Sequence, residues 1–142
     1  MKNVLLCLAL LFASAGAIAQ SEADKNPARE AAEVLAQRYQ LDAKQKAEMV
    51  KIQERKYRNL GEIEPLKKTD PQKFMQKIRS LQQANEKSYE RVLRKEQLQL
   101  FRQEQLALRE KKALVSKEMK SVGASQQEIN QKMTELDLEA MQ

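Results

Sequence analysis

Leu41-Asp42-Ala43-Lys44-Gln45 marks the point where a helix begins. An aspartate just before a helix accepts a hydrogen bond from the backbone N–H three residues later, and a glutamine at that third position reaches back to the aspartate N–H. The stretch Leu93-Arg94-Lys95-Glu96-Gln97 repeats the leucine and the glutamine at the same spacing. It has arginine where the first copy has aspartate, so its sequence alone does not predict a cap.

Proline and glycine indicate the helices on either side of the first motif. Asn26-Pro27 has the pattern of a capping residue followed by a first-turn proline, and apolar residues then recur at helical spacing, which predicts a helix over 27–40. The helix that Asp42 caps is expected to end at Gly61, because glycine favours the left-handed conformation that ends many helices. Residues 62–70 are predicted to form a connection or a short broken helix.

The second half of the chain is dominated by a long helical region. It starts at Asp70-Pro71 and carries a heptad-like apolar stripe, typical of a coiled coil, as far as Gly123. A break near 93–97 and a continuous or bent helix from 71 to about 120 both remain open. Ser125-Gln126-Gln127-Glu128 is a capping box and predicts a final helix that runs to 140.

Residues 1–19 have the three parts of a secretory signal peptide. A basic Met1-Lys2-Asn3 precedes an apolar stretch from Val4 to Phe12, and Ala17-Ile18-Ala19 supplies the small side chains that signal peptidase requires. The apolar stretch is shorter than the roughly 20 residues that cross a membrane. We therefore expect an exported chain without stable membrane insertion and a single all-helical domain over 20–142.

The composition after the signal peptide leaves little material for a thick core. The chain has no tryptophan and three phenylalanines, one of which is Phe12, and 32% of its residues are charged. Such sequences form long amphipathic helices in thin arrangements that a partner subunit often completes. The predicted fold class is therefore all-α, an elongated, thin arrangement of four to five amphipathic helices in a homodimer.

Several kinds of active site are excluded by the residues that the chain lacks. It has no histidine, and its one cysteine, Cys7, lies in the signal peptide. This excludes Ser-His and Cys-His catalysis, ordinary zinc sites and haem ligation by histidine. Gly61 and Gly123 are isolated, so there is no glycine-rich phosphate loop. We predict that the protein is not an enzyme and has no catalytic residue, metal or cofactor.

The charge is concentrated in the middle of the chain. Residues 44–123 carry 21 basic and 11 acidic side chains, a net charge of +10, whereas 20–43 and 124–142 together carry −5. These charges are either solvated helix faces or a surface that attracts acidic partners. Export argues against nucleic acid, and the basic residues are too dispersed for a membrane-binding helix. Unfolded polypeptides fit this surface better.

The two motifs, in a small exported helical chain, resemble those of the Spy/CpxP family of periplasmic proteins, whose signature is a Leu-Thr-x-x-Gln motif that occurs twice. The resemblance covers roughly residues 41–110 and includes the segment 48–53 after the first motif and the segment 89–93 that leads into the second. Asp42 replaces the first threonine and is able to cap a helix, whereas Arg94 replaces the second and cannot. This departure is what leaves the break near Arg94 in doubt.

The resemblance implies an antiparallel, cradle-like homodimer in the periplasm. Its basic, partly apolar concave face would hold unfolded or partly folded envelope proteins without ATP during stress. Some relatives modulate envelope sensor kinases, so the alternative is a regulatory protein with one specific partner; a coiled-coil spacer without a client surface is a third hypothesis. The metal sensing of other relatives is not implied, because the histidine ligands are missing.

Candidate site residues follow from this reading. Those expected to contact clients through charge are Arg55, Lys56, Arg58, Lys73, Lys77 and Arg79, and those expected to contact clients through apolar side chains are Met49, Ile52, Phe74 and Ile78. Those that mark the motifs and helix caps are Leu41, Asp42, Gln45, Leu93 and Gln97.

Overall fold

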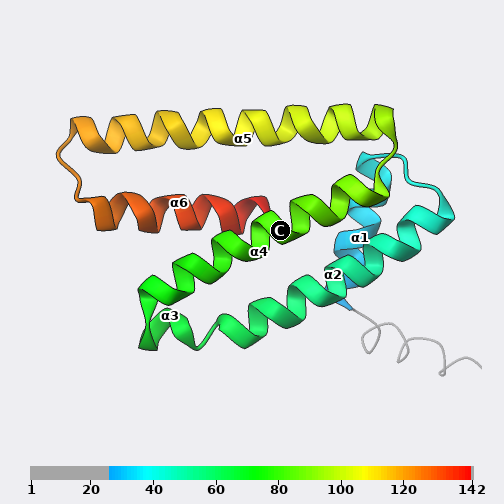
Figure 1. The fold of residues 1–142 in the computed structure, drawn as a ribbon, viewed down its shortest axis with the longest axis horizontal. Coiled ribbons are helices and arrows are strands. Elements are labelled where there is room, and N and C mark those ends of the chain that lie inside the picture. The colour runs from blue at the N-terminus through cyan, green and yellow to red at the C-terminus, as the bar shows by residue number, and fades with distance from the viewer. Residues whose placement is uncertain (1–25, 142) are drawn as a thin grey trace, which may run out of the picture.

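The computed structural model describes residues 26–141, and this part of the chain is helical without any strand (Figure 1). The helices are α1 (Pro27–Arg38), α2 (Ala43–Ile63), α3 (Leu66–Thr69), α4 (Pro71–Val92), α5 (Lys95–Ser121) and α6 (Gln126–Ala140). The predicted all-α class is confirmed. The predicted signal peptide, residues 1–19, lies outside the described residues.

Two helical hairpins and one crossing helix make up the fold. The single turn α3 joins α2 to α4, which return side by side, and α5 and α6 form a second antiparallel pair (Figure 1). α1 packs on α2, and α6 packs on α4, so α6 connects the two hairpins. The ion pair between Lys112 Nζ and Asp137 Oδ1, at 2.5 Å, fastens α5 to α6, and the Asp137 side chain is buried.

Side-chain caps set four of the helix starts as the sequence predicts, and at α1 Asn26 Oδ1 accepts the Ala28 N–H at 3.0 Å. Asp42 Oδ1 accepts the Gln45 N–H at 2.8 Å, and Gln45 Oε1 accepts the Asp42 N–H at 3.2 Å, which completes the capping box of α2. Asp70 caps α4 by accepting the Lys73 N–H at 3.0 Å. Ser125 begins α6 with a second full capping box. Each such cap stabilises a protein by about 1 kcal/mol.

The predicted end of α2 at Gly61 is wrong. Gly61 does not end α2, which continues to Ile63, because the hydrogen-bond ladder runs on and the Glu64 N–H still reaches the Leu60 carbonyl at 3.0 Å. Gly123, with a φ of 81°, has the left-handed conformation that Gly61 was expected to adopt.

α1 also ends earlier than the predicted residue 40. It stops at Arg38, and Gln40 has a φ of 51°. The Leu41 N–H then donates to the Ala36 carbonyl, five residues earlier, at 2.9 Å. This hydrogen bond closes a helix whose last turn is followed by a residue in the left-handed conformation, here Gln40. The turn directs the chain from α1 straight into the first motif.

The core lies where the two motif leucines meet the start of α5. Leu41 packs against both buried clusters, one formed by Ala32, Met49 and Ile52 and the other by Tyr39, Leu93 and Phe101. The Phe101 ring makes edge contacts with Tyr39, at 6.3 Å between centroids, and with Tyr89, at 5.7 Å. Aromatic pairs of this kind contribute roughly 0.5–1.5 kcal/mol beyond their burial.

Candidate functional site

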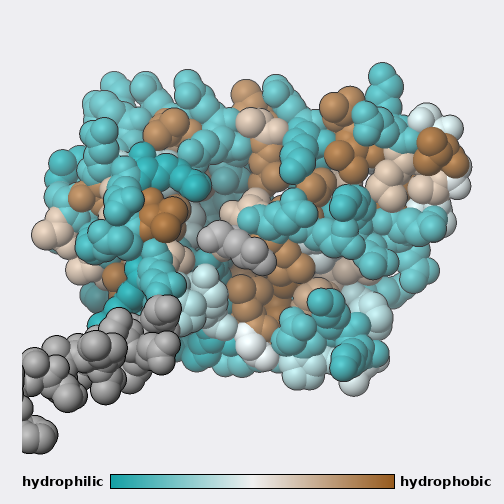
Figure 2. All heavy atoms as spheres, turned by 180° about the vertical axis from the view of Figure 1, so that it is seen from behind, coloured by the Kyte–Doolittle hydropathy of each residue, from teal (hydrophilic) through white to brown (hydrophobic). Residues whose placement is uncertain are grey.

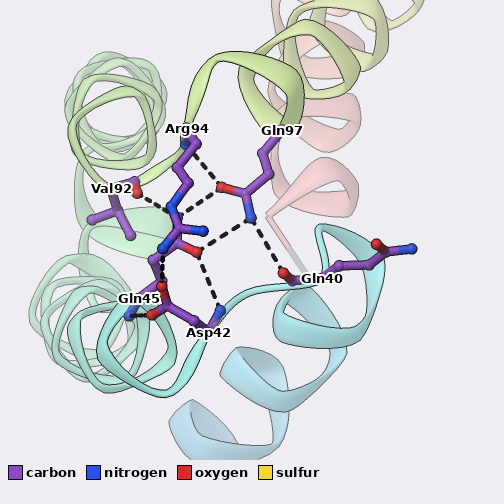
Figure 3. A network of polar contacts seen from close by, with 6 residues as sticks. All are labelled: Gln40, Asp42, Gln45, Val92, Arg94 and Gln97. Carbon is purple, nitrogen blue, oxygen red and sulfur yellow. Dashed lines mark hydrogen bonds and ion pairs between the residues drawn. The ribbon is translucent and has the colours of Figure 1, made fainter.

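The two motifs meet side by side and share a network of hydrogen bonds, although they are far apart in the sequence (Figure 3). Gln45 Nε2 donates to Gln97 Oε1 at 2.7 Å, and Gln97 Nε2 donates back to Gln45 Oε1 at 3.2 Å. Gln45 also donates to the Val92 carbonyl at 2.8 Å, and Gln97 to the Gln40 carbonyl at 3.2 Å. We call this network, made by Gln40, Asp42, Gln45, Val92, Arg94 and Gln97, the glutamine node.

A break between α4 and α5 does occur at the second motif. Leu93 ends α4 in an extended conformation, and α5 begins at Lys95. The Arg94 guanidinium has no acceptor atom and cannot cap α5. Half of a capping box remains, because Gln97 Oε1 accepts the Arg94 N–H at 2.8 Å. The continuous helix from 71 to about 120 is therefore excluded.

Arg94 contributes to the glutamine node through its charge. Its guanidinium pairs with the Asp42 carboxylate, the cap of the other motif. The Gln45 backbone N–H, followed by the Arg94 charge, lowers the pKa of Asp42. The side chains of Arg94 and Asp42 are 66% and 40% exposed, so the pair is worth at most about 1 kcal/mol.

The glutamine node joins helices and offers no reactive group. Amides, backbone carbonyls and the Asp42–Arg94 ion pair satisfy one another there in a partly buried network, and satisfied networks of this kind rigidify a fold. It fixes the starts of α2 and α5 and the ends of α1 and α4 in one place. The motif residues therefore hold four helix ends together, and an exposed charged surface lies elsewhere.

One such surface lies on the hairpin formed by α2 and α4. Exposed lysines and arginines recur there at helical spacing on the side away from the core. We call this surface the basic face; it comprises Lys44, Lys51, Arg55, Lys73, Lys77, Lys87 and Arg91. Arg55 Nη2 donates to Ser88 Oγ at 2.9 Å, which shows that the outer sides of α2 and α4 adjoin. Glu48, which pairs with Lys51 at 2.7 Å, interrupts the positive charge.

The charged residues singled out from the sequence are divided among different surfaces. Arg55, Lys73 and Lys77 are all exposed on the basic face, Arg55 beside Ser88 and the two lysines at the start of α4. Arg58 is exposed on α2, at the edge of the basic face. Arg79 is exposed on the opposite side of α4, where it lines the groove against α6.

Lys56 and the four apolar candidates are not part of an exposed surface. Met49 and Ile78 are fully buried, and Ile52 and Phe74 are 6% exposed, because the apolar stripe of each helix packs into the core. We therefore leave them out of the binding surface proposed below. Lys56 is 2% exposed. Lys56 follows Met49 and Ile52 at helical spacing, so the sequence itself indicates that Lys56 lies on the buried side of α2.

The exposed large apolar side chains lie on other helices. Among residues 26–141 they are Val34 on α1, Leu100, Leu106 and Leu114 on α5, and Val122 at the end of α5. Leu100, Leu106 and Leu114 lie outside the heptad-like stripe of α5, so that stripe gave no signal for them. Phe101 is the one fully buried residue of this long helix.

A cavity of about 390 Å³ separates α1 from α5, with α2 and α4 beneath it and the end of α6 at its side. We call it the α1–α5 cavity. Lys56 and Gln53 of α2 line it, and burial lowers the pKa of Lys56 to about 8. On the wall, Tyr39 donates its hydroxyl hydrogen bond to Glu104, and burial and this contact raise the pKa of Tyr39. Burial also raises the pKa of Tyr89.

Residues 26–141 contain neither a metal-binding cluster nor a membrane-spanning helix. This range contains no cluster of three or more acidic, histidine or cysteine side chains placed to hold a metal ion. It also contains no helix that is both long enough and apolar enough to span a membrane.

No family model, curated protein or solved structure matches the chain.

Proposed function

We propose that the protein is an ATP-independent chaperone of the periplasm that binds unfolded or aggregation-prone polypeptides on its basic face. The observation that carries the proposal is that lysines and arginines, among them Arg55, Lys73 and Lys77, are exposed at helical spacing on two neighbouring helices. Such a surface raises the rate at which acidic, flexible partners associate. The resemblance of the two motifs to the Spy/CpxP signature supports the same function.

Weak and reversible binding is expected from this surface. Its lysines and arginines are exposed, so each contact with a client carboxylate contributes about 0–1 kcal/mol and is screened by salt. The large exposed apolar residues lie on α1 and α5, away from the basic face. A client is therefore held first by charge, and it remains free to fold while bound.

A homodimer is part of the proposal. The core is small, and Leu106 and Leu114 of α5 are 56% and 57% exposed. A second copy that covered such residues would bury apolar surface, and we propose that the resulting dimer is the cradle that the resemblance implies. Light scattering that gives the mass of a monomer at micromolar concentration would contradict the dimer.

Aggregation of an acidic client tests the chaperone proposal. The variant Lys73→Glu/Lys77→Glu reverses two charges on the basic face. Lys117→Glu/Lys120→Glu, on the exposed side of α5, makes the same change in net charge elsewhere. We expect the first variant to lose protection and the second to retain it, and we expect protection by the wild type to fall at high salt. Equal protection by both variants, or none by the wild type at any salt, would refute the proposal.

The regulatory alternative predicts a different set of partners. Crosslinking in the periplasm followed by pull-down should recover many unrelated polypeptides if the protein is a chaperone. One dominant partner, lost in the Lys73→Glu/Lys77→Glu variant, would identify a specific regulator.

A further inference from the structure

The α1–α5 cavity has the size and the apolar walls of a small-molecule site. Its volume of about 390 Å³ lies within the roughly 300–1,000 Å³ of ligand pockets. Val34 and Leu35 of α1 face Ala107 and Leu108 of α5 across it, and Met141 lies at its side. Viewed from behind, the molecule shows patches of hydrophobic side chains toward its middle, among mainly hydrophilic ones (Figure 2).

Lys56 places a positive charge at the floor of this cavity, where it has no acidic partner among residues 26–141. The Nζ donates to the Met141 carbonyl at 2.5 Å and lies 4.6 Å from the centre of the Tyr57 ring. An ammonium group has three N–H donors, and no carboxylate of residues 26–141 forms an ion pair with this one. A buried charge in this situation is costly unless an anion joins it.

Gln53 adds an unpaired polar group one turn away. The residue has no exposed surface, and its Nε2 donates to the Tyr89 hydroxyl at 2.6 Å, whereas its Oε1 has no hydrogen-bond partner within the part of the chain that the structure describes. Turning the amide by 180° would let the Tyr89 hydroxyl donate to Oε1 and would free the NH2 group. In either orientation one end of the amide lacks a partner, and buried groups of this kind are rare in folded proteins.

We propose that the α1–α5 cavity binds an amphipathic carboxylate, of the class of fatty-acid anions. The carboxylate accepts hydrogen bonds from Lys56 and from the turned amide of Gln53, and the alkyl chain lies between Val34 and Leu108. Arg38 and Glu104 are the other charged residues of the lining, and the Glu104 carboxylate already accepts the Tyr39 hydroxyl. The lining therefore has a net positive charge, which favours an anion over a cation or a neutral alcohol.

This site is separate from the proposed chaperone surface. None of the residues of the basic face lines the cavity. Loss of client protection after charge reversal at Lys73 and Lys77 would leave ligand binding unchanged, so each proposal can fail without the other.

Calorimetric titration with dodecanoate, kept below its micelle concentration, tests the proposal. We expect saturable binding with one site per chain, and binding of dodecanol or dodecyltrimethylammonium that is weaker by about tenfold or more, because neither accepts a charge-assisted bond from Lys56. Absence of saturable dodecanoate binding, or equal affinity for the three head groups, would overturn the assignment.

Variants on α2 locate the binding. Lys56→Met keeps the length of the side chain and removes its charge, and should weaken dodecanoate binding by about tenfold or more. Lys51→Met removes a charge from the exposed side of the same helix and should leave the affinity unchanged. Equal affinities of these two variants would overturn the assignment.

A cavity-filling variant tests the location independently of the charge. Leu108→Trp adds bulk to the wall of the cavity and leaves Lys56 in place. We expect it to lose dodecanoate binding while its circular dichroism stays that of the wild type. Retained binding by the folded variant would show that the ligand lies elsewhere.

Discussion

Gln45 and Gln53 lie about two turns apart on α2 and are both buried, but their amides are in opposite situations. In the glutamine node, Gln45 accepts the Asp42 N–H and donates to Val92 and Gln97. In the floor of the α1–α5 cavity, Gln53 has one amide end without a partner, and Lys56 beside it has no counter-charge among the described residues.

The difference separates what holds the fold from what is available for binding. Hydrogen bonds that are complete inside a protein stabilise it, and removing one partner leaves the others unsatisfied. Polar groups that are buried and incomplete reduce stability, and folds retain them where a ligand or a reaction uses them. The glutamine node belongs to the first kind and the cavity floor to the second.

The largest effect is expected at Lys56. Its pKa is lowered to about 8 in the folded protein, so the unfolded chain binds more protons between pH 8 and the unperturbed value near 10.5. The free energy of unfolding should therefore rise with pH above 8, by about 2 kcal/mol up to pH 10. Lys56→Met should remove this rise and gain about 3 kcal/mol at pH 7.

Urea denaturation of both proteins at pH 7, 8, 9 and 10 measures these changes. The raised pKa values of Tyr39 and Tyr89 act in the opposite direction from about pH 9 upward, where the unfolded chain begins to lose phenolic protons, so the difference between wild type and Lys56→Met at each pH isolates the contribution of Lys56. If the free energy of unfolding of the wild type stayed constant from pH 8 to 10, Lys56 would be well solvated, which would contradict its burial in the cavity floor.

A smaller loss is expected at the second motif. Gln97→Ala removes the half cap of α5 and the bond to Gln45, and should cost about 1.5 kcal/mol. Combined with Gln45→Ala it forms a double-mutant cycle, for which we expect a coupling of about 1 kcal/mol. Additive losses would mean that the two glutamines act independently, contrary to the bonds in Figure 3.

Acid should affect the two motifs unequally. The pKa of Asp42 is lowered, so its cap contributes stability above the pKa of the unfolded chain and loses that contribution as the pH falls through the folded value. The cap of α5 is the neutral Gln97 amide, which does not titrate. In an NMR titration from pH 6 to 2, the Gln45 amide proton should move with Asp42 ionisation, and the Arg94 amide proton should move much less.

The smallest effect is expected at Arg94. Arg94→Thr supplies the missing cap of α5 but removes the exposed ion pair with Asp42. The gain and the loss are each about 1 kcal/mol or less, so the unfolding free energy should change by no more than about 0.5 kcal/mol. A loss of 2 kcal/mol or more would show that the ion pair holds the glutamine node together.

The sequence predicted the features that depend on neighbouring residues. The capping boxes at Asp42 and Ser125, and the helix start at Asp70, rest on side chains that reach only three residues along the chain. The break at Arg94 was left open because its cap comes from Gln97 and is held by Gln45, whose distance in the sequence gives no local signal.

The candidate site was harder to predict than the fold. Apolar residues at helical spacing, such as Met49 and Ile78, are identical in sequence whether they face the core or a client, and the structure buries them. The α1–α5 cavity is lined from five helices, so no single stretch of sequence indicates it. Exposed charges such as Lys73 and Lys77 were easier, since a charged helix face is almost always at the surface.

The most direct test makes the same substitution at both glutamines of α2. Gln45→Met and Gln53→Met keep the side-chain length and remove the amide, and urea denaturation at pH 7 gives the free energy of unfolding of each. We predict a loss of about 2 kcal/mol for Gln45→Met and a change within about 1 kcal/mol of zero for Gln53→Met. Equal losses, or a larger loss at Gln53, would contradict the distinction between a structural node and an incomplete binding site.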